Sequence, residues 1–445
     1  MMKGIFLRRR GHFLRDHWFA LILVWLLFFE RLLMLSRLGA EYTLGSDDLS
    51  YVKAGITFYR TNTITMHGVV SAQIMPGLPV LISLFVALFG TGHRLWLALK
   101  MFWCLLGTLA AWFTYLAIDE KAPKVAAILP IFLYFTPDFA WQDNLILTET
   151  PFMFLTCLYI YGLFRSGNRQ DSGSFFIVFG SAFLAFMLKA QASIFLLLPI
   201  LYLWIKKYPS GRLYLQCFIG FCLLVAFIVP WSVRNYYHFG DFIPATYGIG
   251  NPLLLGTYQG EGYPSDEEVF TQEEIDKELL QTYRRFGDDF DQYAPKHLRY
   301  VYMKGDELKA RVRMRYWWRH DRESMLKSYL YLKPKKMLFE TFYWDEVVPG
   351  TKAYIEFSRR IDFTLAMLAV PAAIAAKRYI AEVCFVVIAY WIQVYMYAYA
   401  YVFDRYAQTL LPFRYIAIGF LIASCCLLFE RFSRRVRHKR AMRVE

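Results

Sequence analysis

Residues 415–429 read Tyr415-Ile-Ala-Ile-Gly-Phe-Leu-Ile-Ala-Ser-Cys-Cys-Leu-Leu-Phe429, an unbroken apolar run. With its flanks the run reaches roughly the 20 residues of helix that cross a hydrocarbon layer about 30 Å thick. A basic tail follows, with Arg431, Arg434, Arg435, Arg437, Lys439, Arg440 and Arg443. Because Lys and Arg are enriched on the cytoplasmic side of membrane helices, this stretch predicts a spanning helix whose C-terminal end is cytoplasmic.

Comparable apolar runs recur along the chain, at 19–29, 95–118, 218–229 and 381–402. Of the 445 residues, 57% are hydrophobic, which is more apolar surface than one soluble core buries. Spanning helices satisfy their own backbone hydrogen bonds, so the expected fold class is all-α, a polytopic transmembrane helical bundle. Much of the net charge of +14 lies at the two chain ends, which indicates a contact with membrane lipids and no nucleic-acid partner.

The basic N-terminal residues Lys3, Arg8 and Arg15 also predict a cytoplasmic N-terminus, so the number of crossings must be even. The apolar run at about 76–90 is short and begins with Pro76-Gly77, which favours a juxtamembrane or re-entrant helix closing the first external loop. About ten spans remain: 17–36, 94–117, 123–139, 150–165, two short runs within 174–205, 213–232, 361–376, 379–402 and 408–430.

This topology divides the chain into three predicted units. Residues 1–232 form an N-terminal transmembrane catalytic module that includes the first external loop at 37–93. Residues 233–358 are too polar for a membrane and form a helical extracytoplasmic insertion, and residues 359–445 form a C-terminal transmembrane module. Within the insertion, the acidic stretch 261–291 and the basic stretch 296–336 either pair with each other as solvated faces, or the basic half receives an anionic headgroup or substrate.

Asp47 and Asp48 are the most informative candidate residues of the first external loop. Adjacent carboxylates repel each other, and such a pair suits a general base or a group that orients an acceptor. The alternative is structural, since Ser46 or Asp47 could cap a helix that continues to Phe58. The sequence requires no cofactor, although a divalent cation such as Mg²⁺ or Mn²⁺ could be held by Asp47, Asp48 and Glu149.

The predicted topology also places Glu149, Lys189, Arg234 and Arg405 at the outer ends of spans. Lys and Arg are usually depleted from the external ends of membrane helices, so cations at these positions are unusual. Three such cations around one outer cavity would bind a phosphate. The alternative is that each long side chain reaches lipid phosphates on its own. A carboxylate such as Glu149 at the edge of an apolar segment needs a partner, and cations of neighbouring external loops are the nearest candidates.

In their order along the chain, these residues resemble the GT-C superfamily of polyprenyl-phosphate-sugar glycosyltransferases, particularly the bacterial relatives of protein O-mannosyltransferase and the lipid A aminoarabinose transferase. Lys189 stands where that family usually has Arg-Pro. The matching pieces are Asp47-Asp48-x-x-Tyr51, Met75-Pro76-Gly77-Leu-Pro79, Leu147-Thr-Glu149-Thr, Leu188-Lys189-Ala-Gln-Ala, Pro230-Trp231-x-x-Arg234-Asn235 and Asp404-Arg405-Tyr406.

The resemblance implies a multi-pass protein of the bacterial plasma or inner membrane with an extracytoplasmic active site. It implies transfer of a sugar, with inversion, from a polyprenyl-phosphate donor to a glycan, lipid or protein acceptor. Asp47 would be the catalytic base with Asp48 as its neighbour. The donor and its phosphate would be bound by Glu149, Lys189, Arg234, Asn235, Arg405, Tyr51 and Tyr406.

Two other functions use the same basic outer cavity. A flippase or transporter of a lipid-linked saccharide would need the cations and no base. A polymerase or ligase would instead transfer a pre-assembled oligosaccharide from its lipid carrier. The replacement Asp47→Asn separates an enzyme from a transporter, because only the enzyme depends on that carboxylate.

Overall fold

The computed structural model describes residues 2–262, 277 and 294–441, with the side chains of residues 2–13 and 438–441 left aside. The described chain is helical apart from one short hairpin, in which β1 (Thr65–Met66) pairs with β2 (Val69–Val70). The long helices are α1 (Met2–Leu38), α4 (His93–Asp119), α7 (Glu149–Arg169), α8 (Ser172–Leu188), α9 (Ile194–Ile205), α10 (Ser210–Phe239), α17 (Lys352–Ala376), α18 (Ile380–Tyr399) and α19 (Asp404–Ala441). The expected all-α class is confirmed.

Five segments of the described chain are long and apolar enough to cross a membrane: Leu14–Leu38, His93–Asp119, Ser210–Phe239, Ile380–Tyr399 and Asp404–Arg437. The chain is therefore described as an integral membrane protein. Each of the ten predicted spans falls on a helix, but α8 and α9 are shorter than a full crossing requires. The run 123–139 is interrupted, with α5 (Lys124–Ile128) and the 3₁₀ turn Leu129–Tyr134 followed by α6 (Pro137–Gln142). Pro130 and Pro137 each lack the amide hydrogen that a continuous helix would use there.

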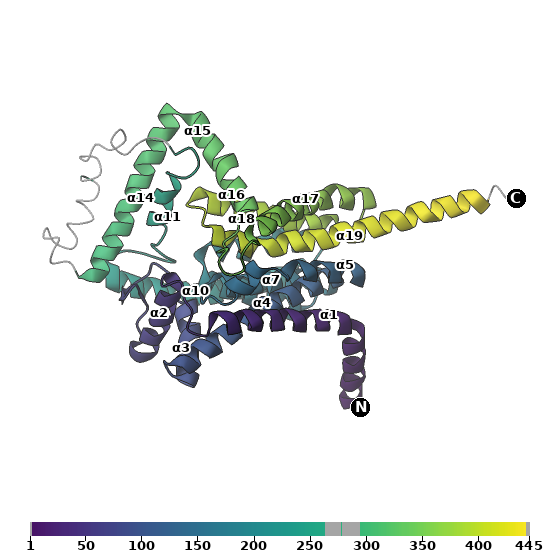
Figure 1. Ribbon diagram of the computed structural model, residues 1–445, viewed down its shortest axis with the longest axis horizontal. Coiled ribbons are helices and arrows are strands. Elements are labelled where there is room, and N and C mark those ends of the chain that lie inside the picture. Colours follow the sequence, from purple (N-terminus) through teal and green to yellow (C-terminus); the bar gives the residue numbers. More distant parts are fainter. Residues whose placement is uncertain (1, 263–276, 278–293, 442–445) are drawn as a thin grey trace.

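The spanning helices lie alongside one another, and several shorter elements gather at one end of this bundle, whereas α5 lies toward the other end (Figure 1). α4 packs against α1 and α7, and α17 packs against α19. At the left end in Figure 1 lie α2 (Asp47–Thr61), α3 (Gly77–Phe89), α11 (Gly250–Gly256) and α14 (Pro295–His320). Both chain ends lie at the opposite end of the bundle, which agrees with an even number of crossings.

A buried ion pair joins the short helix α6 to α17. The Arg359 Nη2 group donates a hydrogen bond of 2.5 Å to Asp138 Oδ2, and Arg359 Nη1 donates to the Tyr415 hydroxyl at 2.7 Å. Thr136 and Thr341 also donate to the Asp138 carboxylate. Asp138 is 0% exposed and Arg359 is 2% exposed, so neither charge has water as an alternative partner. These bonds fix α6 shortly before the chain turns into α7.

A second buried pair holds the turn between α6 and α7. Arg31 Nε of α1 donates to Asp143 Oδ2 at 2.9 Å, and Thr150 Oγ1 of α7 donates to Asp143 Oδ1 at 2.8 Å. Gly107 of α4 lies against the same carboxylate, where an added Cβ would be 1.9 Å from an Asp143 oxygen. The first turn of α7, which begins at Glu149, is therefore fixed against both α1 and α4.

The segment after α10 forms a cap over the outer end through α11, α14, α15 (Arg322–Lys327), the π-helical turn Ser328–Leu332 and α16 (Lys333–Phe339). Close backbone approach holds α11 in place. A Cβ on Gly250 would be 1.8 Å from the Met303 carbonyl oxygen, and a Cβ on Gly256 would be 2.5 Å from that of Ala400. α11 thus packs between α14 and the loop that follows α18. The acidic stretch predicted at 261–291 lies almost entirely outside the described residues.

Candidate functional site

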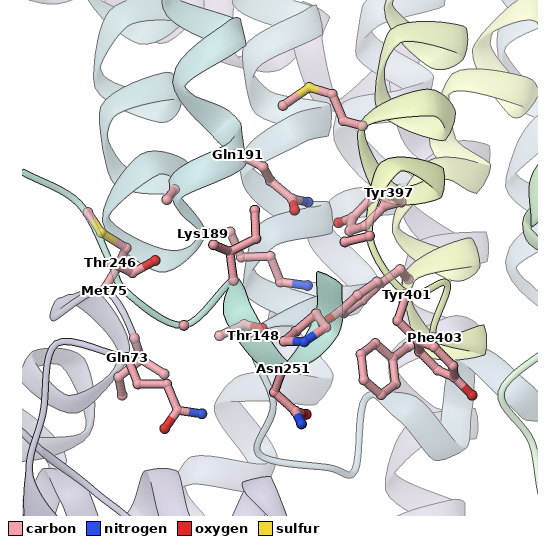
Figure 2. A pocket seen from close by; sticks show the side chains of 18 of the residues that line it. Gln73, Met75, Thr148, Lys189, Gln191, Thr246, Asn251, Tyr397, Tyr401 and Phe403 are labelled. Carbon is pink, nitrogen blue, oxygen red and sulfur yellow. The ribbon is translucent and has the colours of Figure 1, made fainter. Parts of the chain in front are cut away.

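A cavity of about 1360 Å³ lies between this cap and the neighbouring ends of the spanning helices. Its polar side is formed by the start of α2, the β1–β2 hairpin, the turns before α7 and after α8, and the first residues of α19. Figure 2 shows Lys189 and Gln191 facing Tyr397, Tyr401 and Phe403 across this space. Segments that are far apart in the sequence therefore contribute to one site.

Four charged side chains form a compact cluster in the cavity, which we call the Asp47 cluster: Asp47, Glu149, Lys189 and Arg405. Arg405 Nη2 donates to Asp47 Oδ2 at 2.8 Å, and Lys189 Nζ donates to Glu149 Oε1 at 3.0 Å. Arg405 Nε lies 3.5 Å from Glu149 Oε1 and makes no hydrogen bond. The cluster contains two cations and two carboxylates, so its net charge is zero.

Helix ends explain where three of these charges lie. Asp47 and Glu149 are the first residues of α2 and α7, where the positive end of the helix dipole favours a carboxylate. Lys189 follows the last residue of α8, where the negative end favours a cation. Arg405 lies in the first turn of α19, where the dipole is unfavourable, and its two carboxylate neighbours supply the compensating charge.

Aromatic rings support the two cations. The Lys189 ammonium lies 4.3 Å from the centroid of the Tyr406 ring, and the Arg405 guanidinium lies 5.5 Å from the same centroid. Tyr397 stacks on Tyr406 with a centroid distance of 4.6 Å. Tyr51 of α2 also lines the cavity. Tyr51 and Tyr406, which the motifs identify as candidates, are thus neighbours of the Asp47 cluster.

Asp48 does not line the cavity. Its carboxylate accepts hydrogen bonds from the backbone N–H groups of Leu44, at 2.6 Å, and Ser46, at 3.1 Å, and the residue is 1% exposed. Asp48 therefore folds the turn that precedes α2 and leaves Asp47 as the carboxylate that faces the cavity. Both oxygens of Asp48 accept from backbone N–H groups in this structure, so Asp48 does not join Asp47 at the cavity, and its catalytic role stays a prediction.

Arg234 and Asn235 also lie outside the cavity lining. Arg234 donates to the carbonyl oxygens of Ser71, at 2.9 Å, and Ile64, at 3.1 Å, while Asn235 donates to that of Ile243, at 2.8 Å. These bonds tie the end of α10 to the loop between α1 and α4 and to the loop that follows α10. In this structure Arg234 and Asn235 hold these loops and do not line the cavity, so their contact with a donor phosphate stays a prediction.

The three carboxylates considered for a divalent cation do not converge. Asp47 and Glu149 face cations, and Asp48 faces its own turn. In the described parts of the chain, no group of three or more His, Cys, Asp or Glu side chains has a metal-binding arrangement. The residues present therefore do not fit the divalent cation, and no step is assigned to one.

Several lining residues had no signal in the sequence motifs. Arg299, Tyr302, Met303 and Asp306 are spaced as one face of α14, and this face forms part of the cavity wall. His67, Gln73 and Asn251 add further polar groups. Helical spacing could have identified the face on α14, but not the direction in which it points.

The opposite wall of the cavity is apolar and belongs to α18, one of the five candidate spanning helices. Several of its lining residues remain open at the surface of the protein, with Ile388 52% exposed and Tyr399 51% exposed. The α18 residues that line the cavity are Val387, Ile388, Trp391, Ile392, Tyr395, Met396, Tyr397 and Tyr399. The cavity therefore combines charged groups with an apolar wall that is open at the surface of the protein.

A second, smaller cavity of about 380 Å³ adjoins the first. Asp47, Tyr401, Phe403 and Arg405 line both cavities. The remaining lining residues of the second cavity are Leu44, Ser46, Lys336, Phe342, Trp344, Val402 and Asp404. Asp47 thus lies at the border between the large cavity and the smaller one.

No protein-family model and no curated protein matches the chain. Among solved structures, the chain is similar to ArnT from Cupriavidus metallidurans bound to undecaprenyl phosphate, with 11% identity, 92% of this chain and 78% of that chain covered, and a TM-score of 0.41. The chain is also similar to ArnT from the same organism in the apo state, with 12% identity, 94% of this chain and 78% of that chain covered, and a TM-score of 0.37. A third similar structure is the Archaeoglobus fulgidus oligosaccharyltransferase tethered with an acceptor peptide, with 12% identity, 92% of this chain and 50% of that chain covered, and a TM-score of 0.37. ArnT is the lipid A aminoarabinose transferase, one of the relatives that the sequence motifs resemble.

Proposed function

We propose that the chain is an integral membrane glycosyltransferase that moves a sugar from a polyprenyl-phosphate donor to an acceptor hydroxyl group. The observation that carries the proposal is the Asp47 cluster facing the exposed apolar wall of α18 across one cavity. A ligand with a long apolar tail and an anionic head is complementary to such a site, because the tail can follow α18 while the head meets Lys189 and Arg405.

The reaction takes place on the extracytoplasmic face. The cavity lies at the end of the bundle opposite to the two chain ends (Figure 1). Both chain ends carry clusters of Lys and Arg, which the positive-inside rule assigns to the cytoplasm.

Asp47 acts as the general base. Arg405 Nη2 donates to its Oδ2 atom at 2.8 Å and so fixes the carboxylate at the border of the cavity. The acceptor oxygen attacks the anomeric carbon and gives its proton to Asp47, while the bond between that carbon and the phosphate oxygen breaks. The departing phosphate keeps the electron pair of that bond. Attack from the side opposite to the phosphate inverts the anomeric carbon.

Lys189 and Arg405 stabilise the charge that develops on the departing phosphate. In the structure, Glu149 lies against both cations and keeps them in place before a donor binds. The proton gained by Asp47 offsets the negative charge gained by the phosphate, so the total charge of the site is unchanged during transfer.

The second cavity is proposed to receive the acceptor. Asp47 borders both cavities, as a base must if the donor occupies one and the hydroxyl group approaches from the other. Phe342, Trp344 and Phe403 give the second cavity aromatic walls, and aromatic faces stack on sugar rings and apolar groups.

Trp344→Ala is therefore expected to raise the KM for the acceptor several-fold, up to about tenfold, with little change in kcat or in the KM for the donor. Steady-state kinetics with each substrate varied in turn would measure this. Trp318→Ala is the matched control, because Trp318 is similarly exposed and lines neither cavity. An equal rise in both KM values would contradict the assignment of this cavity to the acceptor.

The activity is tested with purified protein in proteoliposomes that contain a polyprenyl phosphate carrying a radiolabelled monosaccharide, together with a membrane extract as the source of acceptor. Transfer of the label to the extract, with release of polyprenyl phosphate, supports the proposal. Movement of intact labelled lipid across the bilayer without cleavage would show a transporter instead. Transfer that occurs only from a polyprenyl diphosphate oligosaccharide would show a polymerase or ligase.

A further inference from the structure

Arg299 differs from the other two cations of the large cavity. Lys189 and Arg405 each lie within 3.5 Å of a carboxylate oxygen. Arg299 has no carboxylate partner among the residues that the structure describes, and its one hydrogen bond runs from Nε to Gln73 Oε1 at 3.1 Å. Within the described part of the chain, neither terminal nitrogen of this guanidinium has a hydrogen-bond partner, and Arg299 lines the large cavity.

The surroundings of Arg299 do not offset its charge. Burial lowers the pKa of the neighbouring His67 and Arg299 lowers it further, whereas Asp47 acts in the opposite direction. His67 is therefore neutral at neutral pH. Asp306 lies seven residues further along the same face of α14, about 10 Å along the helix axis, and accepts a hydrogen bond from Asn251 at 3.1 Å. The positive charge of Arg299 is thus balanced neither by its direct contacts nor by the neutral Asp47 cluster.

The position of Arg299 is fixed by its partner. The backbone N–H of Gln73 donates to Ser71 Oγ at 2.9 Å, and the loop before α11 packs closely on the Gln73 backbone. A Cβ on Gly248 would be 2.3 Å from the Gln73 carbonyl oxygen. Gln73 therefore holds the Nε edge of the guanidinium, and the opposite edge has the two parallel donors that bind a carboxylate or phosphate in bidentate fashion.

We infer that Arg299 binds a second anionic group of the substrate, separate from the phosphate at Lys189 and Arg405. This inference rests on the proposed function and narrows its substrate class to head groups with two anionic groups. With a polyprenyl monophosphate donor, the second group is a carboxylate on the transferred sugar; the other phosphate of a lipid diphosphate has the same chemistry but belongs to the polymerase or ligase alternative. In both cases the same chemistry recognises it, a pair of oxygens that accept from the two terminal nitrogens.

Short soluble ligands separate the two sources. The dissociation constants of farnesyl phosphate and farnesyl diphosphate, and of glucose 1-phosphate and glucuronic acid 1-phosphate, are measured by calorimetry on the full-length protein in detergent. In one of these pairs the wild-type protein is expected to bind the doubly anionic member about tenfold more tightly. Arg299→Gln removes that preference and leaves the affinity for the singly anionic member within about twofold. Arg315→Gln, a control on the exposed side of α14, leaves both affinities unchanged.

If the Arg299→Gln variant still binds the doubly anionic ligand more tightly than the singly anionic one, the inference is overturned. It is also overturned if the variant binds both ligands of a pair more weakly by the same factor, because Arg299 would then bind the single phosphate. No preference in either pair for the wild-type protein would also overturn it. If the wild-type protein binds neither farnesyl ligand, the proposed function itself fails. Binding of both farnesyl ligands with no effect of Arg299→Gln contradicts only the role of Arg299.

Discussion

Replacing Asp47 by asparagine is expected to lower kcat for sugar transfer by about 10²-fold to 10⁴-fold. Asparagine preserves the shape of the side chain and can still accept a hydrogen bond from Arg405, but it cannot take the proton of the acceptor hydroxyl group. Donor binding should change little, because Lys189 and Arg405 keep their contacts with Glu149. The rate is measured in the proteoliposome assay, and donor affinity is measured separately by calorimetry.

Glu41→Gln is a suitable control for Asp47→Asn. Glu41 lies in the same external loop, its side chain is 64% exposed, and its one ion pair is with His93. This variant should transfer sugar at the rate of the wild-type protein. Transfer by Asp47→Asn at more than a tenth of the wild-type rate would refute the role of Asp47 as the base. Loss of donor binding in step with loss of transfer would also refute it, since the carboxylate would then serve only to organise the cations.

Asp138→Leu is expected to destabilise the folded protein by about 2–4 kcal/mol. The replacement removes the nearer of the two carboxylates of the buried Arg359 guanidinium, leaving Asp362 Oδ2 at 3.3 Å, and it removes the acceptor for Thr136 and Thr341. Breaking a buried pair by removing one partner is costly, because the remaining charge has no water around it. The loss is measured as a lower midpoint of thermal or denaturant unfolding in detergent.

Two further variants test the reason for that loss. The triple variant Asp138→Leu with Arg359→Met and Asp362→Leu removes all three charges of this contact, so it should be more stable than Asp138→Leu alone. Glu430→Gln breaks a pair with Arg434 in which both side chains are exposed, 62% and 83%, and should change stability by at most about 1 kcal/mol. If the triple variant is no more stable than Asp138→Leu, then an incompletely paired buried charge is not the cause.

The sequence identifies the helical bundle because its two signals are local: the length of each apolar run and the cations that flank it can be read from consecutive residues. It also identifies Asp47, Glu149, Lys189 and Arg405 as candidates, because a charge at the end of an apolar run is unusual wherever it occurs. It does not show that these charges meet. Asp47 and Arg405 are 358 positions apart, and only the folded bundle brings them to 2.8 Å.

Asp48 and Arg234 have the same residue types as Asp47 and Arg405, but their side chains point away from the cavity. Asp47 and Asp48 are adjacent, and a helix start turns one toward the cavity and the other toward the preceding turn. A guanidinium binds carbonyl oxygens as readily as phosphate oxygens, so the residue type of Arg234 does not distinguish the two. Arg299 was missed for a related reason, because the sequence gives the spacing along α14 without the orientation of that helix.

The two chain ends lie apart from each other, but both lie at the end of the bundle opposite to α2, α11 and α14 (Figure 1). An affinity tag fused to either end would therefore attach the protein to a sensor chip with the cavity-lining helices α2, α11 and α14 turned toward the flowing solution. Single molecules in nanodiscs, captured in this way, would all present the same leaflet to added substrate.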